Sequence, residues 1–392
     1  MKRILLSIIF TLAIVVGLMA AFSTTALADA GPDINSSSAA GAVYVMTNSP
    51  TTNANMVVMF NRDSHGMLTE VGPFSTEGTG SGTVRAAPPI DQLTSQGSLA
   101  LTQDGKWLLA VNAGSNSITV FRVRNDGLDY VDQVGSGGTF PVSLTISGDE
   151  VFVLNQGTNS AGNVTVNPSI VGFTLGKKGD LDPNGSSYTF SNYSTYTQVG
   201  FNNDGNWLVV IDKAGGNIDV FSVNHWGMLA AAPVVNPTTV GVGPFGLTFD
   251  AKDHLLVVNA GEGSVSSYSI DRDGSLDTIS GDILHQQLAA CWIVSDGDNI
   301  YTANPGSPSI SLYKEMDSTG KISITTADEQ EVKGIPSIDM GITNNGRFLY
   351  ALDPVAGEIY GFMVMPDGTL NSLLGSPFGS GLPIYAQGIA VQ

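Results

Sequence analysis

Short apolar runs separated by polar turns recur along the chain. In the clearest copy, an apolar strand at Trp107–Asn112 follows an Asp-Gly turn, and a strand of alternating polarity follows at Ile118–Phe121. Another Asp-Gly turn at 126–127 closes the unit. Alternation over four to eight residues is typical of half-buried β-strands, and Asp-Gly is a hairpin signal. The pattern predicts an all-β fold built from one repeated unit, with no convincing helix in the body of the chain.

One polar position marks the period of this repeat. The second strand of each unit ends in Asn or Asp, which gives seven marker residues: Asn48, Asn112, Asn155, Asp212, Asn259, Asn304 and Asp353. Four of the six gaps between them span 43 to 49 residues, near the length of a four-stranded propeller blade. The two longer gaps predict insertions, one around Thr76–Thr94 and one that combines Gly157–Pro168 with Asn184–Ser194. We expect each marker side chain to bond the backbone two residues on and set up the turn.

The two ends of the chain together complete one unit. The first unit, starting at Ala42, lacks its innermost strand, and the chain finishes with a lone strand pattern at Tyr385–Val391. Pairing the two ends closes a ring and removes a sheet edge that would otherwise template aggregation. The sequence thus predicts a seven-bladed β-propeller of four-stranded antiparallel blades, closed by the C-terminal strand. A pair of β-sandwiches is the alternative, and it explains the fixed period poorly.

The N-terminus has the pattern of a targeting signal. Lys2 and Arg3 precede an apolar run, and A-x-A cleavage sites end at Ala28 and Ala30. We expect a signal peptide over 1–28, a flexible leader over 29–40 and the propeller over 41–392. The mature protein would be extracytoplasmic, either secreted or periplasmic. The apolar run is also long enough to span a bilayer, so a retained anchor that tethers the body is the alternative.

Charge and cysteine content narrow the set of partners. The formal net charge is −19, and loss of the two N-terminal cations would make the mature body more acidic still. An acidic surface repels phosphate backbones, so nucleic acid is a poor partner, and a soluble monomer is expected. Cys291 is the sole cysteine, which excludes an internal disulfide. Its apolar surroundings predict a buried, inert thiol.

Two copies of the repeat, Leu108–Gly114 and Leu255–Gly261, resemble the YVTN-type propeller repeat. Residues 41–392 as a whole resemble the lactonase-like seven-bladed propellers, which include 6-phosphogluconolactonase-like and carboxymuconate cyclase-like proteins. The resemblance implies His and Arg where the innermost strands enter the central channel, often just after a proline. In this chain Pro141, Pro244 and Pro336 are each followed by residues of other types.

Three residues are candidates for catalysis at the channel. Arg85 lies in a loop that leads to an innermost strand, where a cation could bind a carboxylate or stabilise an oxyanion. His285 lies in another such loop, and Asp339 lies in an innermost strand, where it could act as a base. The alternatives are a solvated arginine, a histidine without function and a hydrated carboxylate. Other polar residues of these strands would give a neutral channel lining: Gln198, Thr145, Thr248 and Gln387.

The remaining polar motifs are interpreted as turns. His65, His225 and His254 lie in or beside hairpin turns and are expected to be exposed. Asp271–Asp277 faintly resembles a calcium loop, but the same turn recurs in other copies, which predicts a hairpin. Because no Cys/His cluster, phosphate loop or dinucleotide fingerprint is present, we predict no metal and no other cofactor.

Two functions follow from these observations. The favoured one is a binding or scaffold protein that takes a small molecule, glycan or protein at the loop-bearing face and channel mouth, because that mouth is poor in acid–base groups. The alternative, implied by the resemblance, is a lactone hydrolase or cyclase acting on a sugar lactone or muconolactone. Arg85 would then hold the carbonyl oxygen, and His285 or Asp339 would activate water.

Overall fold

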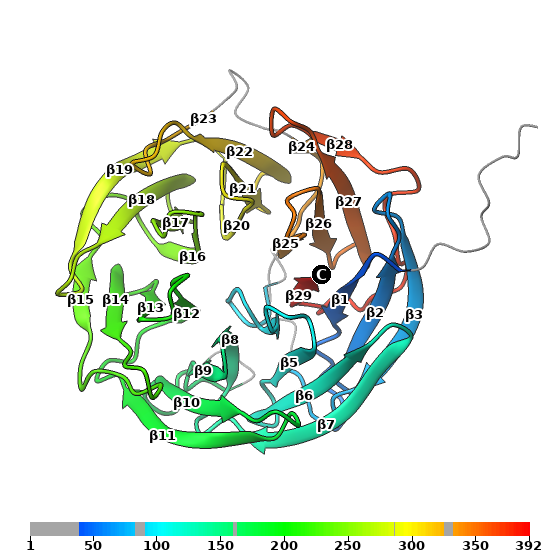
Figure 1. The fold of residues 1–392 in the computed structure, drawn as a ribbon, viewed down its shortest axis with the longest axis horizontal. Coiled ribbons are helices and arrows are strands. Elements are labelled where there is room, and N and C mark those ends of the chain that lie inside the picture. Colours follow the sequence, from blue (N-terminus) through cyan, green and yellow to red (C-terminus); the bar gives the residue numbers. More distant parts are fainter. Residues whose placement is uncertain (1–38, 83–90, 160–162, 286, 325–331) are drawn as a thin grey trace, which may run out of the picture. The chain divides into compact units, whose positions relative to one another are not determined.

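The protein is described by a computed structural model that covers residues 39–82, 91–159, 163–285, 287–324 and 332–392. Within these ranges the secondary structure is entirely β-strand and turn, without an α-helix. The strands form seven antiparallel sheets arranged as blades around a centre (Figure 1). This confirms the predicted seven-bladed propeller. No helix in the described ranges has the length and apolar character needed to cross a membrane.

Each blade runs from an innermost to an outermost strand, and the first four blades are as follows. Blade 1 consists of β29 (Ile389–Val391), β1 (Gly41–Met46), β2 (Met56–Arg62) and β3 (Leu68–Ser75). Blade 2 consists of β4 (Leu99–Leu101), β5 (Trp107–Asn112), β6 (Ser117–Arg124) and β7 (Gly127–Gly135). Blade 3 consists of β8 (Pro141–Ser147), β9 (Glu150–Asn155), β10 (Ser169–Leu175) and β11 (Leu181–Thr189). Blade 4 consists of β12 (Tyr196–Phe201), β13 (Trp207–Asp212), β14 (Asn217–Ser222) and β15 (Val234–Pro237).

The last three blades repeat this order. Blade 5 consists of β16 (Pro244–Phe249), β17 (Leu255–Asn259), β18 (Ser264–Ile270) and β19 (Leu276–Leu284). Blade 6 consists of β20 (Trp292–Ser295), β21 (Asn299–Asn304), β22 (Ser309–Glu315) and β23 (Ile322–Ile324), with β24 (Val332–Lys333) also paired to β22. Blade 7 consists of β25 (Met340–Ile342), β26 (Phe348–Asp353), β27 (Glu358–Val364) and β28 (Leu370–Ser372).

The marker residues lie where the repeat predicted them. One of the predicted insertions is shorter than expected. Six markers end the second strand of their blade, and Asn48 follows two residues after β1. The prediction that Asn184–Ser194 is wholly an insertion was wrong, because residues up to Thr189 belong to β11. This strand is the outermost of its blade and mostly faces solvent. Because its residues are largely polar, this strand could not be predicted from the pattern of hydrophobic positions.

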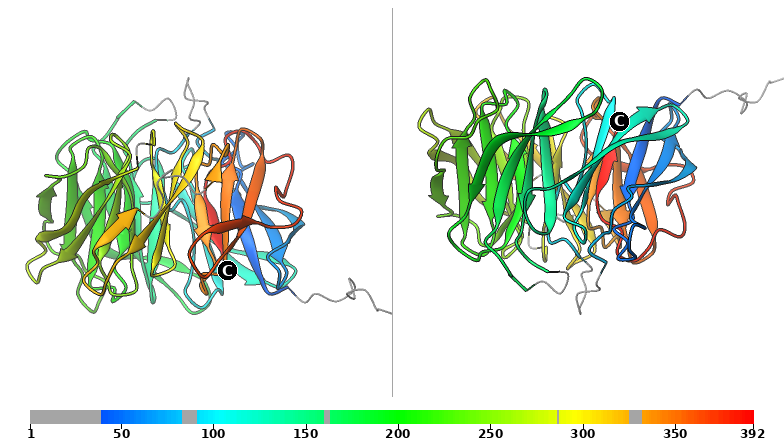
Figure 2. Two further views of the ribbon diagram at one scale, coloured as in Figure 1. Left: turned by 90° about the horizontal axis from the view of Figure 1, so that it is seen from above. Right: turned by 90° about the horizontal axis from the view of Figure 1, so that it is seen from below.

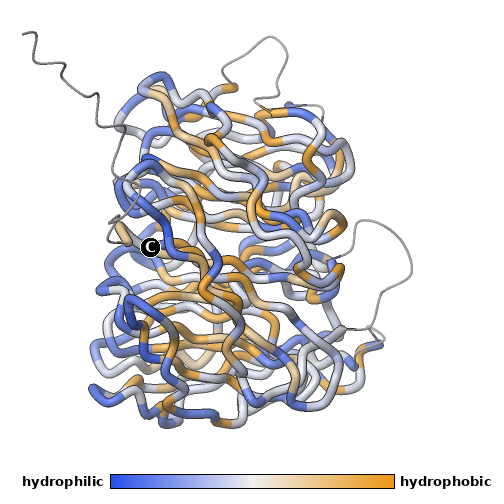
Figure 3. The backbone as a smooth tube through the Cα atoms, turned by 90° about the vertical axis from the view of Figure 1, so that its right-hand side faces the viewer, coloured by the Kyte–Doolittle hydropathy of each residue, from blue (hydrophilic) through white to orange (hydrophobic). Residues whose placement is uncertain are grey.

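Apolar residues of neighbouring blades pack face to face. The second strands are the most deeply buried; every residue of β5 and of β26, for example, is buried. Figure 3 shows hydrophobic segments within the blades and hydrophilic segments at many of the turns. In side view the strands run across the thickness of the ring, with turns on both faces (Figure 2). The turns are thus free to carry function while the blades hold them in place.

The C-terminal strand closes the ring as predicted. In the register of β1 and β29, Val43 pairs with Val391 and Val45 pairs with Ile389. Arg62 reinforces the closure, since its Nη2 donates to the carbonyl oxygen of Gln392 at 3.0 Å. The free edge of β1 is therefore covered by the other end of the chain.

Candidate functional site

The innermost strands begin on the face of the ring that carries the marker residues. In blade 4, Tyr196 at the start of β12 pairs with marker Asp212 at the end of β13. In blade 5, Pro244 at the start of β16 pairs with marker Asn259. We call the end of the central channel on this face the mouth. The connections between blades also arrive here, so side chains from several blades converge on one place.

The end of the first predicted insertion lies inside the ring. Residues 91–97, here called the channel segment, lead into β4 and are seen in cyan near the centre of Figure 1. The carbonyl oxygen of Gly97 accepts a hydrogen bond from the N–H of Leu144 in blade 3 at 2.8 Å. The N–H of Gln96 donates to the carbonyl oxygen of Thr197 in blade 4 at 3.2 Å. The segment therefore ties blades together from within the channel.

Glutamine side chains form hydrogen bonds with backbone groups of the innermost strands. The side chain of Gln96 donates to Ile293 O (2.8 Å) and accepts from Ile293 N (3.0 Å). Gln198 makes the same pair of bonds with Leu247, at 3.1 and 2.7 Å. Each side-chain amide thus bonds to both the N–H and the carbonyl oxygen of one residue, as a neighbouring strand would. Gln198, predicted to line the channel, is buried and spends its hydrogen bonds on the neighbouring blade.

Asp339 lies directly before β25 and is only 3% exposed. Its Oδ1 accepts a hydrogen bond from the N–H of Met340 at 3.0 Å, and the N–H groups of Gly388 and Ile389 also donate to the carboxyl group. Burial nevertheless raises its pKa well above the ordinary value, and the negative charge of Asp91 raises it further. Asp339 is therefore a carboxyl group that resists ionisation.

Asp91 is a second carboxylate at this site, and the sequence reasoning missed it. It begins the channel segment and is partly exposed. Its Oδ1 accepts hydrogen bonds from Thr94 N and from Gln387 Nε2, both at 2.7 Å. Asp91 is thus partly exposed whereas Asp339 is buried, and the charge of Asp91 raises the pKa of Asp339.

Lys213 supplies a cation to the same region. It directly follows marker Asp212, and its Nζ lies 4.7 Å from the centre of the Phe245 ring. That ring packs edge-on against Trp292, whose indole N–H donates to the carbonyl oxygen of Ser95 in the channel segment at 3.1 Å. An ammonium over an aromatic face is held in place by attraction to the ring. The Phe245 ring therefore positions Lys213 beside the channel segment.

Cys291 lies directly before β20, and both of these opposite charges act on its thiol. Burial raises the pKa of its thiol to about 12, the charge of Asp91 also raises it, and the charge of Lys213 lowers it. The net effect keeps the thiol protonated and buried, as the sequence predicted. The charges of Asp91 and Lys213 thus both act on the Cys291 thiol.

The sequence matches the family model for the lactonase, 7-bladed beta-propeller, over residues 34–178 and 192–381. The chain belongs to this lactonase family. The resemblance seen in the repeats is thereby confirmed. Among curated protein sequences, none matches the chain.

Solved structures of lactonase-like propellers are similar over nearly the whole lactonase-family chain. A periplasmic gluconolactonase of Pseudomonas aeruginosa gives a TM-score of 0.67 at 17% identity, covering 90% of this chain and 98% of that one. A provisionally assigned 6-phosphogluconolactonase of Bacteroides uniformis gives 0.70 at 17%, covering 90% and 99%. A similarly assigned protein of Bacteroides fragilis gives 0.69 at 18%, covering 91% and 99%. At these identities the likeness is one of fold.

The structure of the lactonase-family propeller describes two of the three residues predicted to be catalytic. Arg85 lies outside the described residues. His285 lies in the predicted loop between β19 and β20 and is fully buried. Its ring packs edge-on against Tyr313 at 5.5 Å, and its Nδ1 accepts from Gln287 N at 3.0 Å. These neighbours belong to blade 6 and its connection, whereas Asp339 contacts the closing strand.

A positional signal could have found Lys213. Of the seven residues that directly follow a marker, Lys213 is the only cation. In blade 3 the same position holds Gln156, whose Nε2 donates to Leu93 O at 3.3 Å and Tyr196 O at 2.9 Å. Leu93 belongs to the channel segment and is fully buried. The position after the marker in both blades therefore reaches the mouth, which the repeat alone could have indicated.

The predicted turn residues have mixed outcomes. His65 and His225 are exposed, and the residues after Asp271 form the predicted hairpin turn, closed by Gly274 N donating to Asp271 O at 2.9 Å. The prediction for His254 was wrong, because its side chain is only 15% exposed. It is covered where two blades meet, a contact that a single repeat does not reveal.

A groove on the opposite face of the lactonase-family propeller joins blades 2, 3 and 4. It has a volume of about 1020 Å³ and carries four cations against two carboxylates, although the chain as a whole is strongly acidic. The cations are Lys106, Arg122, Arg124 and Lys177. The guanidinium of Arg122 lies 5.0 Å from the ring of Trp107. We call this feature the basic groove.

Proposed function

We propose that this lactonase-family protein hydrolyses a sugar lactone at the mouth of its channel. The observation that carries the proposal is the convergence of one cation, Lys213, and two carboxyl groups, Asp91 and Asp339, on one region. These are the charges that ester hydrolysis uses. The family membership supports the same reaction class, and the similarity to a periplasmic gluconolactonase supports the substrate class.

The reaction divides the roles among the three groups. The oxygen of water bonds to the lactone carbonyl carbon while water gives up a proton, and the ring C–O bond breaks as the ring oxygen takes up a proton. In our proposal Lys213 holds the carbonyl oxygen as it becomes negative. Asp91 accepts the proton from water, and Asp339, whose pKa is raised by burial, supplies the proton to the ring oxygen. Two carboxyl groups with contrasting surroundings commonly divide base and acid roles in this way.

The test is hydrolysis of glucono-δ-lactone by the purified mature protein. Lys213→Met and Asp91→Asn should each lower kcat by about 100-fold or more, since they remove the oxyanion partner and the base. Lys178→Met removes an exposed lysine of an outer turn and should leave kcat unchanged. Wild-type protein that hydrolyses neither glucono-δ-lactone nor other sugar lactones would contradict the proposal. Equal rates in the Lys213 and Lys178 variants would contradict the role of Lys213.

Arg85 remains a proposed second cation for the substrate, because it precedes Asp91 by only six residues in the chain. Arg85→Ala should raise KM and leave kcat nearly unchanged if it binds a substrate anion. His285 is proposed to stabilise the fold, because its side chain is fully buried. Turnover should therefore persist in folded His285→Gln protein. Loss of turnover in that variant with the fold intact would return His285 to the catalytic set.

We further propose that the protein acts outside the cytoplasm. The support is the signal-like pattern of residues 1–28 and the periplasmic gluconolactonase among the similar structures. Mass spectrometry of the protein from a native or matched host should find a chain that starts after Ala28 or Ala30. A full-length chain recovered with the membrane would support a retained anchor instead.

The basic groove favours a second candidate function, the binding of an acidic glycan. Clustered cations on an otherwise acidic protein indicate a ligand of negative charge. Arg122→Gln combined with Arg124→Gln should weaken binding of oligogalacturonate by about tenfold or more, because charge-assisted bonds are lost. Lys333→Gln, an exposed site on blade 6, is the control. No binding by the wild-type protein at low salt would eliminate this candidate.

A further inference from the structure

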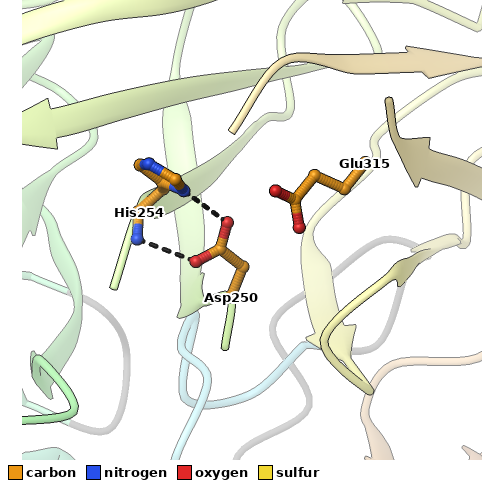
Figure 4. A group of neighbouring side chains, drawn as sticks. All are labelled: Asp250, His254 and Glu315. Carbon is orange, nitrogen blue, oxygen red and sulfur yellow. Dashed lines mark hydrogen bonds and ion pairs between the residues drawn. The ribbon is translucent and has the colours of Figure 1, made fainter. Parts of the chain in front are cut away.

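Three side chains with metal-binding groups meet between blades 5 and 6, on the face opposite the mouth. Asp250 follows β16, His254 precedes β17, and Glu315 ends β22. One potential ligand atom from each lies within 4.8 Å of the other two. Figure 4 shows the carboxylate of Glu315 directed across the blade boundary toward the other two side chains. None of these residues belongs to the mouth or to the basic groove.

Glu315 occupies a place that the repeat normally gives to an apolar residue. Its N–H donates to the carbonyl oxygen of the residue before the second strand, Asp298, at 2.9 Å. The N–H groups at the same place in blades 2, 4 and 7 make the equivalent bond, and they belong to Val123, Val223 and Val364. Blade 6 therefore carries a carboxylate where three other blades carry valine.

The Glu315 carboxylate is buried and only half satisfied. Its side chain is 3% exposed, and Oε2 has no hydrogen-bond partner among the described residues. Oε1 accepts from Nζ of Lys252 at 2.6 Å, and that lysine side chain is 41% exposed. A buried carboxylate oxygen without a partner is costly to the fold. Such a group is retained more readily where a ligand completes its bonding.

Asp250 has one oxygen committed to the turn and one facing His254. Oδ1 accepts from Lys252 N at 2.8 Å and from His254 N at 2.9 Å. In blades 2 and 7 the same turn position holds a threonine, Thr102 or Thr343, whose hydroxyl serves the same backbone function. A carboxylate is therefore not needed for the turn. It leaves Oδ2 free to lie 2.7 Å from Nδ1 of His254.

His254 also departs from the repeat. The residue five positions before the marker, whose N–H bonds to the side chain of the turn, is Trp107 in blade 2, Trp207 in blade 4 and Phe348 in blade 7. In blade 5 it is an imidazole, covered by the turn of blade 6. A Cβ on Gly320 of that turn would lie only 2.6 Å from the ring of His254. At all three positions of the site, the residue thus differs in type from its equivalents in other blades. The backbone at Gly320 also packs closely against one of them, His254.

We propose that Asp250, His254 and Glu315 bind one divalent transition-metal ion, of the zinc class, that joins blade 5 to blade 6. One imidazole and two carboxylates suit zinc better than calcium or magnesium, which prefer oxygen ligands alone. Zinc–ligand bonds of about 2.0–2.2 Å place neighbouring ligand atoms about 3.3–3.5 Å apart, so the trio needs only a small rearrangement. Lys252 occupies Glu315 Oε1 and competes with the ion for that carboxylate.

The matched variant for the test is Glu315→Val, which restores the residue of three other blades and should fold well. After treatment with EDTA, Zn²⁺ alone should raise the Tm of the wild-type protein and bind at one ion per chain, measured by scanning fluorimetry and by elemental analysis. Glu315→Val should show no such rise, and its Tm without metal should equal or exceed that of the wild type. No shift in the wild type, or an equal shift in both proteins, would overturn the proposal.

Three further measurements separate this site from adventitious binding. His65→Asn and His225→Asn remove exposed histidines and should leave the response to Zn²⁺ unchanged; loss of the response there would assign the binding to the surface. Lys252→Met should tighten Zn²⁺ binding about three- to tenfold, because it removes a competing ion pair. Weaker binding in the Lys252 variant would contradict the arrangement proposed for Glu315. Ca²⁺ and Mg²⁺ should raise the Tm less than Zn²⁺ does.

Discussion

The marker residues bond across strands as well as within turns. In blade 5, Asn259 donates to the hydroxyls of Ser264 and Ser266 at 3.1 and 3.0 Å. Asn112 and Asn304 make the same two bonds, to the residues five and seven positions on. The sequence reasoning explained the marker only as a turn residue. Its side chain also links the second and third strands of the blade, which accounts for the recurrence of Asn rather than any turn former.

The aspartate markers come closer to the expected role. Oδ1 of Asp353 accepts from Val355 N at 2.9 Å, two residues on, as predicted. Asp212 accepts from Gly215 N at 2.8 Å, three residues on, and from Asn217 Nδ2 at 3.3 Å. The position seven residues on from Asp212 holds a second carboxyl group, Asp219. Two acidic groups therefore face each other in blade 4, where blades 2, 5 and 6 have an amide and a hydroxyl.

Asp219→Ser should stabilise the protein at pH 8. Burial and the neighbouring Asp212 raise the pKa of Asp219 to about 7, above its ordinary value of 3.8. The unfolded chain thus ionises first, and the wild type loses stability as pH rises from about 4 through 7. The variant carries the hydroxyl found in blades 5 and 6, and its free energy of unfolding at pH 8 should be higher by about 1–3 kcal/mol. Urea unfolding at pH 5 and 8 measures the effect, with exposed Asp182→Ser as the control.

Gln198→Leu should destabilise the protein by about 1–3 kcal/mol, because it leaves both the N–H and the carbonyl oxygen of Leu247 without a partner. The side chains have similar size, so packing changes little. Urea unfolding measures the loss. Gln103→Leu, an exposed turn glutamine, should change the free energy of unfolding by less than about 0.5 kcal/mol. Equal effects at the two positions would show that the bonds of Gln198 contribute nothing.

At the scale of elements, the strands could be predicted and the channel segment could not. The strands repeat, so each copy supports the others. The bonds of the channel segment join it to blades far along the chain, as when Gln387 Nε2 donates to Asp91 Oδ1 across 296 positions. A repeated sequence pattern cannot predict such a contact, because the contact occurs only once and joins distant residues. Asp91 therefore went unrecognised although the insertion that ends near it was identified.

Removal of residues 389–392 should open the ring. The truncated chain loses β29, which leaves the edge of β1 uncovered and Arg62 without the carbonyl oxygen of Gln392. An unpaired strand edge pairs readily with other chains, so we expect a lower Tm and higher-order species. Scanning fluorimetry and size-exclusion chromatography measure both. Ile389→Val keeps the strand and should remain close to the wild type; a monomeric truncated protein with unchanged Tm would contradict the closure.

For the whole molecule, the sequence predicted the fold but identified only part of the site. Period, markers and incomplete ends were sufficient for seven blades. Asp339 was recognised because the sequence predicted it within an innermost strand; the structure places it directly before that strand, β25. Lys213 was missed because the family resemblance implies cations after prolines, whereas Lys213 follows a marker. Contacts between blades, such as those of His254, depend on how copies stack and are invisible within one copy.

The pH dependence of stability is another property of the whole fold. Burial lowers the pKa of His285 from 6.5 to about 4, so the unfolded chain takes up the proton first as pH falls. The wild type should therefore lose up to about 3 kcal/mol between pH 6.5 and 4 through this residue. His285→Gln should lose less over the same range in urea unfolding. His65→Gln, at an exposed histidine, should follow the wild-type curve; identical curves for all three proteins would contradict the burial of His285.

The most direct test of the mouth as the reactive site is a crystal structure with a bound sugar δ-lactam, which has the shape of the lactone but resists hydrolysis. We expect the lactam carbonyl oxygen within about 3 Å of Lys213 Nζ, beside Asp91. A lactam that binds in solution but lies in the basic groove, or elsewhere away from Lys213, would contradict the assignment.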